Sequence, residues 1–254
     1  MRAIVLALMT LVAAAASAEE FVLIPIAARD IPGANGSIWR SSLSVTNHSE
    51  HDVYVSGIEP CQVGICVTPL ISPKTTVLIT TPFGGSYIST DDPDSLAIQL
   101  RVQDISRQAE TWGTTIPTVR ESQALTAPRT ANLIGIPVTA EFRSLLRVYD
   151  FDRIDENPPT KIRVRFYSIN PVQTPPNGPH DVLLLETTYE LVPDPAYPPH
   201  WTPRMASIPL WAISELSGVQ VVRIEVEPLT QGLRFWAFVS VTNNNTQHVT
   251  VICP

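Results

Sequence analysis

Charged side chains are scarce in this sequence, and lysine is scarcer still. Only 16% of the 254 residues are charged, against about a quarter in an average globular protein, which disfavours long helices and coiled coils. Lys74 and Lys161 are the only lysines, and the formal net charge is -7. The sequence contains no basic run, Walker loop or dinucleotide-binding fingerprint. We therefore expect no binding to nucleic acids or nucleotides.

Catalytic motifs are missing as well. There is no G-x-S-x-G nucleophile elbow, and the five histidines stand in polar or proline-rich surroundings: His48, His51, His180, His200 and His248. We predict that the protein is not an enzyme and has no cofactor. A hydrolase whose residues converge from distant loops is the remote alternative, because a catalytic triad is a spatial arrangement.

Long apolar runs are absent beyond the N-terminus. Met1 and Arg2 precede an apolar stretch that reaches about Ala15, and Ala16-Ser17-Ala18 follows. This pattern is typical of a secretory signal peptide, and it is shorter than the roughly 20 apolar residues that span a bilayer. We expect cleavage of residues 1–18 and a secreted mature chain, extracellular or periplasmic, without a transmembrane segment.

Cysteine is limited to Cys61, Cys66 and Cys253. In an oxidising compartment thiols pair where geometry permits. Cys61 and Cys66 are the disulfide candidates because they close a small loop that contains Gly64. The pairing of Cys253 is left open. Three thiols without CxxC spacing do not match a zinc site, and we predict no metal.

What the sequence does have is short apolar strings of alternating character, rich in β-branched residues and separated by Pro, Gly, Asn and Asp. Examples are Leu43–Val45, Val53–Val55, Val77–Ile79, Leu96–Val102, Leu145–Val148, Ile162–Phe166, Val182–Leu185, Val221–Val226 and Phe235–Val241. This period of two predicts an all-β protein. The segment Leu210–Leu216 fits either one short helix or a bent edge segment.

An internal repeat suggests the domain organisation. Trp39-Arg40-Ser41-Ser42-Leu43-Ser44-Val45, after Ile24-Pro25, corresponds to Phe142-Arg143-Ser144-Leu145-Leu146-Arg147-Val148, after Ile116-Pro117. Each copy is followed by three further predicted strands. We predict two tandem Ig-like antiparallel β-sandwich domains, 19–108 and 109–254. The alternative is one double-sized sandwich whose halves share a core.

Two segments carry a resemblance. The opening, Ile24-Pro25-Ile26-Ala27-Ala28-Arg29 with Pro32-Gly33-Ala34-Asn35-Gly36-Ser37-Ile38-Trp39-Arg40-Ser41-Ser42-Leu43, resembles that of a group of secreted bacterial proteins. The ending, Phe235-Trp236-Ala237-Phe238-Val239-Ser240-Val241-Thr242-Asn243-Asn244-Asn245-Thr246, is similar to the ending of the same group. The resemblance implies an exported Ig-like β-sandwich without established catalytic activity.

Two proline-rich loops, Asn170–Pro179 and Pro193–Pro203, are candidate contact surfaces because such loops are extended and stiff. The second loop supplies the candidate binding residues Tyr197, His200 and Trp201, whose rings could stack on a sugar. The acidic stretch Asp150–Asn157 begins D-x-D, which leaves calcium between Asp150 and Asp155 open against a solvated loop. His48 and His51 fit a polar turn better than a metal site.

These observations favour a secreted, non-enzymatic binding or structural module of the cell envelope or extracellular space. Its partner would be an envelope or extracellular protein, or a polysaccharide. The alternative is a carbohydrate-binding protein that uses the aromatic loop around Tyr197 and Trp201.

Overall fold

The computed structural model describes residues 19–26, 28, 30–57, 70–79, 86–106, 113–151, 160–169, 181–193 and 203–254. Within these ranges every regular element is a β-strand or a three-residue 3-10 turn, and all strand pairs are antiparallel. The predicted all-β class is confirmed. The Ig-like identity of the two halves stays a prediction. No helix in the described ranges has the length and apolar character needed to cross a membrane.

The N-terminal half contains two five-stranded sheets. One has the order β10-β1-β7-β4-β5, and the other the order β2-β3-β8-β9 with β6 on β3. Their strands are β1 (Glu20–Ile24), β2 (Ile31–Pro32), β3 (Ile38–Asn47), β4 (Val53–Ser56), β5 (Leu70–Ile71), β6 (Thr76–Ile79), β7 (Ser86–Thr90), β8 (Leu96–Asp104), β9 (Thr114–Ile116) and β10 (Val119–Arg120). The 3-10 turns are η1 (Ala34–Gly36), η2 (Pro93–Ser95) and η3 (Glu121–Gln123). The strands β9 and β10, which follow residue 108, thus pair with β8 and β1.

The C-terminal half forms one nine-stranded sheet of order β11-β18-β13-β16-β15-β14-β17-β12, with β19 also on β18. Its strands are β11 (Leu125–Thr126), β12 (Ala131–Pro137), β13 (Phe142–Asp150), β14 (Thr160–Ile169), β15 (Asp181–Pro193), β16 (Arg204–Pro209), β17 (Val221–Pro228), β18 (Arg234–Asn243) and β19 (Val249–Ile252). The long β15 pairs with β14 over most of its length and with β16 at its end. It therefore joins the two parts of the sheet that enclose the core of the C-terminal half. Segment 210–216 forms two 3-10 turns, η4 (Leu210–Ala212) and η5 (Ser214–Leu216), in place of one helix.

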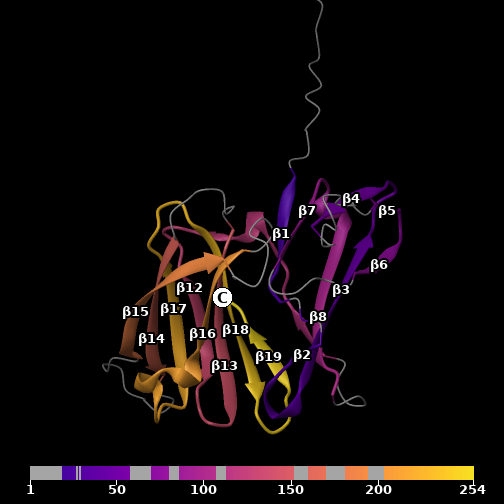
Figure 1. Ribbon diagram of the computed structural model, residues 1–254. Coiled ribbons are helices and arrows are strands. Elements are labelled where there is room, and N and C mark those ends of the chain that lie inside the picture. The colour runs from indigo at the N-terminus through magenta and orange to yellow at the C-terminus, as the bar shows by residue number, and fades with distance from the viewer. Residues whose placement is uncertain are drawn as a thin grey trace, which may run out of the picture.

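Buried apolar side chains form two clusters. The C-terminal cluster includes Leu146, Phe166 and Ile224 and lies inside the folded nine-stranded sheet. The N-terminal cluster includes Leu23, Leu43 and Leu100, together with Tyr149, Phe151 and Phe238 from the C-terminal half. In Figure 1 the two halves lie side by side, with β13, β18 and β19 on the side that faces the N-terminal strands. The N-terminal core is therefore completed by side chains from the other half.

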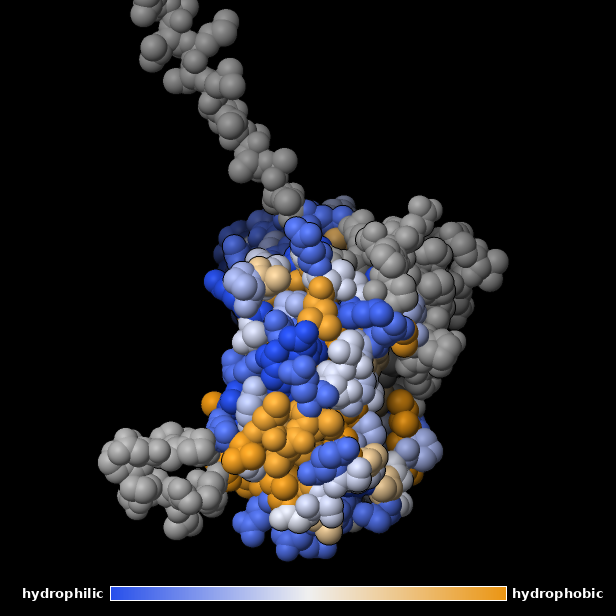
Figure 2. Space-filling model, turned by 90° about the vertical axis from the view of Figure 1, so that its left-hand side faces the viewer, coloured by the Kyte–Doolittle hydropathy of each residue, from blue (hydrophilic) through white to orange (hydrophobic). Residues whose placement is uncertain are grey.

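The outer face over β14 and β15 faces the viewer in Figure 2, where an apolar area adjoins a charged one. Cross-strand ion pairs on this side of the sheet join Arg165 to Glu186, Glu225 and Glu227. Val182 and Leu183 on β15 are about half exposed. Because surface ion pairs contribute at most about 1 kcal/mol each, the cores rather than this face hold the sheet together.

The repeat is visible in the structure as two strands with matching side-chain contacts. Ser41 on β3 donates to the carbonyl of Ile26 and accepts from the amide of Ala28, while Ser144 on β13 donates to the carbonyl of Pro137. The Ile-Pro pair that contacts the second copy is thus Ile136-Pro137, whereas Ile116 belongs to β9 of the N-terminal half. The pairing of this strand repeats as well, since β3 pairs with the third and fifth strands that follow it, β6 and β8, and β13 pairs with the third and fifth strands that follow it, β16 and β18.

Candidate functional site

Most of the predicted site residues lie outside the described ranges. Tyr197, His200 and Trp201 do so, and so do Cys61 and Cys66; their roles stay predictions. Cys253 is described, and it is a half-buried free thiol that packs against the N-terminal core. Burial raises the pKa of this thiol above its ordinary value.

Asp150, the first residue of the predicted calcium loop, is fully buried. Its carboxylate accepts a hydrogen bond from the Thr160 hydroxyl at 2.7 Å and lies 3.8 Å from a guanidinium nitrogen of Arg204. Asp152 and Asp155 lie outside the described ranges. No group of three or more His, Cys, Asp or Glu side chains in the described part of the chain is placed to hold a metal ion. Asp150 therefore serves the packing between β13, β14 and β16.

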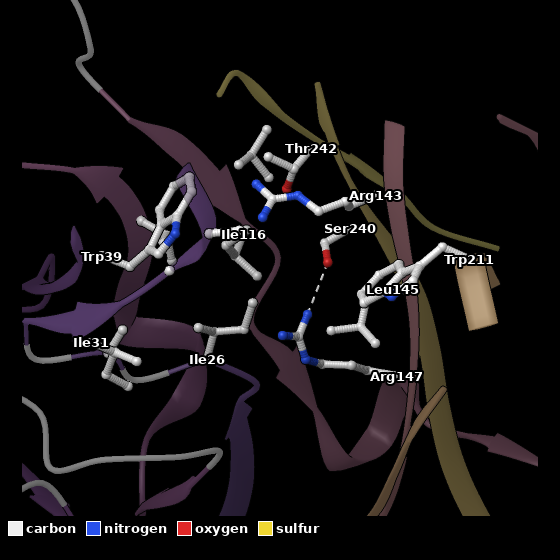
Figure 3. A pocket seen from close by; sticks show the side chains of 15 residues that line it. Ile26, Ile31, Trp39, Ile116, Arg143, Leu145, Arg147, Trp211, Ser240 and Thr242 are labelled. Atoms are coloured by element: carbon white, nitrogen blue, oxygen red, sulfur yellow. Dashed lines mark hydrogen bonds between the residues drawn. The ribbon is translucent and has the colours of Figure 1, made fainter. Parts of the chain in front are cut away.

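A cavity of about 470 Å³ lies where the two halves meet. Among the described residues, apolar side chains dominate its lining; the polar side chains are Arg143, Arg147, Ser240 and Thr242, and Trp39 and Trp211 add their indole N–H groups. Figure 3 shows Trp39 on one side of the cavity and β13, with its two arginines, on the other. A volume of this size falls in the range of small-molecule sites.

The first wall comes from the opening segment of the sequence. Ile26, Ala28, Ile31, Gly33, Ala34 and Trp39 all line the cavity. A Cβ on Gly33 would lie 2.4 Å from the indole nitrogen of Trp39 and 2.3 Å from the Ser37 hydroxyl. Glycine is thus required here for space, because its φ of -110° suits any residue. The amide of Gly33 also donates to the carbonyl of Ser37 at 2.8 Å, which fixes the turn against the indole.

The second wall comes from one face of β13 and β18. Alternation along β13 places Leu146 and Val148 in the C-terminal core, and Arg143, Leu145 and Arg147 in the cavity. On β18 the same alternation directs Ser240 and Thr242 to the cavity. Both strands are therefore covered on two faces, one by their own core and one by the N-terminal half.

The two arginines have few partners. Arg147 donates to the Ser240 hydroxyl at 2.9 Å, and its guanidinium carbon lies 5.9 Å from the centre of the Phe238 ring. Arg143 donates to the Gln247 side-chain oxygen at 2.7 Å, while its Nε is buried without a partner. No carboxylate among the described residues forms an ion pair with either one. Burial lowers the pKa of Arg147 from its ordinary value, because the surrounding protein removes water from the cation.

Direct hydrogen bonds tie the halves together around the cavity. The Tyr149 hydroxyl donates to the Pro25 carbonyl at 2.5 Å, and burial raises the pKa of this phenol. The Thr114 hydroxyl donates to the Val249 carbonyl at 2.6 Å, joining β9 to β19. These contacts hold the opening segment and β9 against the sheet that carries the arginines.

Neither family models, nor curated proteins, nor solved structures give a match to this chain. The site is therefore defined by its geometry alone. Sequence reasoning used Arg143 and Arg147 only as markers of the repeat. A usable signal was present, since Arg143, Leu145 and Arg147 occupy alternate positions of one strand whose other face is apolar.

Proposed function

We propose that the protein is a secreted, non-enzymatic binding module that holds a small ligand in the cavity between its two halves. The observation that carries the proposal is a mostly apolar cavity in which two arginines have no carboxylate partner among the residues that the structure describes. Unpaired cations are costly in a site with little water, whereas a binding site places a few polar groups in an apolar lining. The cell envelope or the extracellular space is where this module would act.

The cavity favours an apolar ligand over a sugar. A carbohydrate presents hydroxyl groups around its ring, and each one needs a hydrogen-bond partner when it is buried. Isoleucine, leucine, valine and tryptophan side chains supply most of this lining. Carbohydrate binding through Tyr197 and Trp201 would use a different surface, and it is the alternative to this proposal.

A neutral apolar probe tests whether the cavity binds at all. We expect N-phenyl-1-naphthylamine to bind the mature protein with fluorescence enhancement at one site. Leu145→Trp, which places an indole in the cavity, should abolish the enhancement. Leu78→Trp on β6 is the matched control, because Leu78 is 73% exposed and does not line the cavity. Absence of binding to the wild type, or equal binding to the Leu145→Trp protein, would contradict the proposal.

A further inference from the structure

We infer that the ligand of this cavity is an organic anion, a carboxylate with an apolar chain or ring. The inference rests on the proposed function and adds the chemical class of the ligand. It follows from the placement of the two arginines relative to the apolar wall.

The arginines offer more donors than the protein uses. A guanidinium carries five N–H groups and no acceptor, and Arg143 and Arg147 each make one hydrogen bond to a side chain. Both of these acceptors, Gln247 and Ser240, are uncharged. The positive charges are therefore left without a counter-charge from the described residues, and an anion entering the cavity would supply it.

The two cations are close enough in sequence to serve one ligand. Arg143 and Arg147 are four residues apart on one strand, which separates their Cα atoms by about 13 Å. Their side chains extend toward the cavity on either side of the Ser240 hydroxyl (Figure 3). A carboxylate near this hydroxyl would accept from the guanidinium groups, and a planar carboxylate matches the fork of donors that arginine presents.

The apolar wall opposite the arginines indicates which kind of group is attached to the anion. Ile26, Ile31 and Ile116 lie opposite the arginines in Figure 3, and Trp39 lies beside them. These side chains offer contact area to an alkyl chain or an aromatic ring and few hydrogen bonds. A sugar phosphate or a nucleotide would leave buried hydroxyl groups unpaired on this wall. A ligand with one anionic end and an apolar body satisfies both walls.

The experiment measures binding of decanoate, with 1-decanol as a neutral ligand of the same chain length, by isothermal titration calorimetry. We expect decanoate to bind the wild type at least tenfold more tightly than decanol. Arg147→Gln and Arg143→Gln should each weaken decanoate binding by about 10- to 100-fold, as expected for the loss of a charge-assisted hydrogen bond, and leave decanol binding unchanged. Arg129→Gln is the control, because Arg129 is exposed and lies away from the cavity.

The outcomes separate this inference from the function on which it rests. Equal affinity for decanoate and decanol, or full decanoate affinity in both arginine variants, would contradict the inference that the ligand is an anion. The proposal of a cavity that binds apolar molecules would still stand. Failure of the wild type to bind decanoate, decanol and the neutral naphthylamine would overturn both proposals. If Arg147→Gln does not fold, Arg147→Lys and Arg143→Gln decide the question, since lysine keeps the charge but not the fork of donors.

Discussion

At the scale of single residues, the strands that carry the two copies of the repeat end on different buried polar residues. Asn47 ends β3 and Asp150 ends β13, each eight residues after the aromatic residue that starts the motif, and both are fully buried. The Asn47 amide donates to the carbonyls of His51 and Ile71 at 2.7 and 2.8 Å. The Asp150 carboxylate instead accepts from Thr160 and faces Arg204. The same place in the strand thus requires a donor in one copy and an anion in the other.

Exchanging these two residue types should destabilise the protein at either position. Asp150→Asn removes the carboxylate charge that faces buried Arg204, and Asn47→Asp sets a buried carboxylate against two carbonyl oxygens. We expect each change to lower the free energy of unfolding by about 3 kcal/mol, measured by urea unfolding. Asp52→Asn, at an exposed position, should change it by less than about 0.5 kcal/mol. A neutral result at Asp150 would mean that the contact with Arg204 contributes nothing.

At the scale of elements, the turn η2 depends on its cap. The Asp92 carboxylate accepts from the Ser95 hydroxyl at 2.5 Å and from the Ser95 amide, and it lies 3.0 Å from His51 Nε2. The hydrogen bond from the Ser95 side chain is the main cause that lowers the pKa of Asp92 below its usual value. A carboxylate with a lowered pKa adds stability above its unfolded pKa of about 4 and loses it as the pH falls through the folded value.

Ser95→Ala should therefore have a pH-dependent effect. We expect the variant to be less stable than the wild type by about 1 kcal/mol at pH 7, with the difference shrinking as the pH falls below about 4 and disappearing once Asp92 is protonated in both proteins. Urea unfolding across this range, with NMR titration of the Asp92 carboxyl, provides the measurement. Ser95→Thr keeps the hydroxyl and should behave like the wild type. A difference that does not change with pH would exclude the carboxylate as its origin.

The sequence predicted the elements better than it predicted their surroundings. Alternation in β14 and β17 indicated one buried and one solvent-facing side, and their outer faces do carry Arg163, Arg165 and Glu225 in ion pairs. The denser apolar run Phe235–Val241 is typical of a strand covered on both faces, and β18 is such a strand. Period and composition cannot show what covers the second face, because the partner lies in the other half of the chain. For this reason the cavity could not be predicted from the sequence.

At the scale of the whole molecule, the N-terminal core depends on a residue from the C-terminal half. Phe238 stacks on Tyr149 with ring centres 6.1 Å apart, and both belong to the N-terminal cluster.

Phe238→Ala should lower the free energy of unfolding by about 3 to 5 kcal/mol and increase amide hydrogen exchange in β1, β3, β7 and β8. Phe166→Ala is the matched control, since Phe166 is equally buried but lies in the C-terminal cluster; its effect should centre on β12, β14 and β17. If Phe238→Ala changes amide exchange only in the strands of its own sheet, the claim that Phe238 completes the N-terminal core is wrong.

The shared core also determines the order in which the chain can fold. Ribosomes make the N-terminal strands first, yet Tyr149 reaches its acceptor, the Pro25 carbonyl, across 124 residues of sequence, and Phe238 is made later still. Contacts of such long range form slowly, and an incomplete core exposes apolar surface and strand edges that promote aggregation. A nascent chain that stops before β18 would thus hold ten strands around an unfinished interior. This protein should depend on chaperones that keep it unfolded until synthesis is nearly complete.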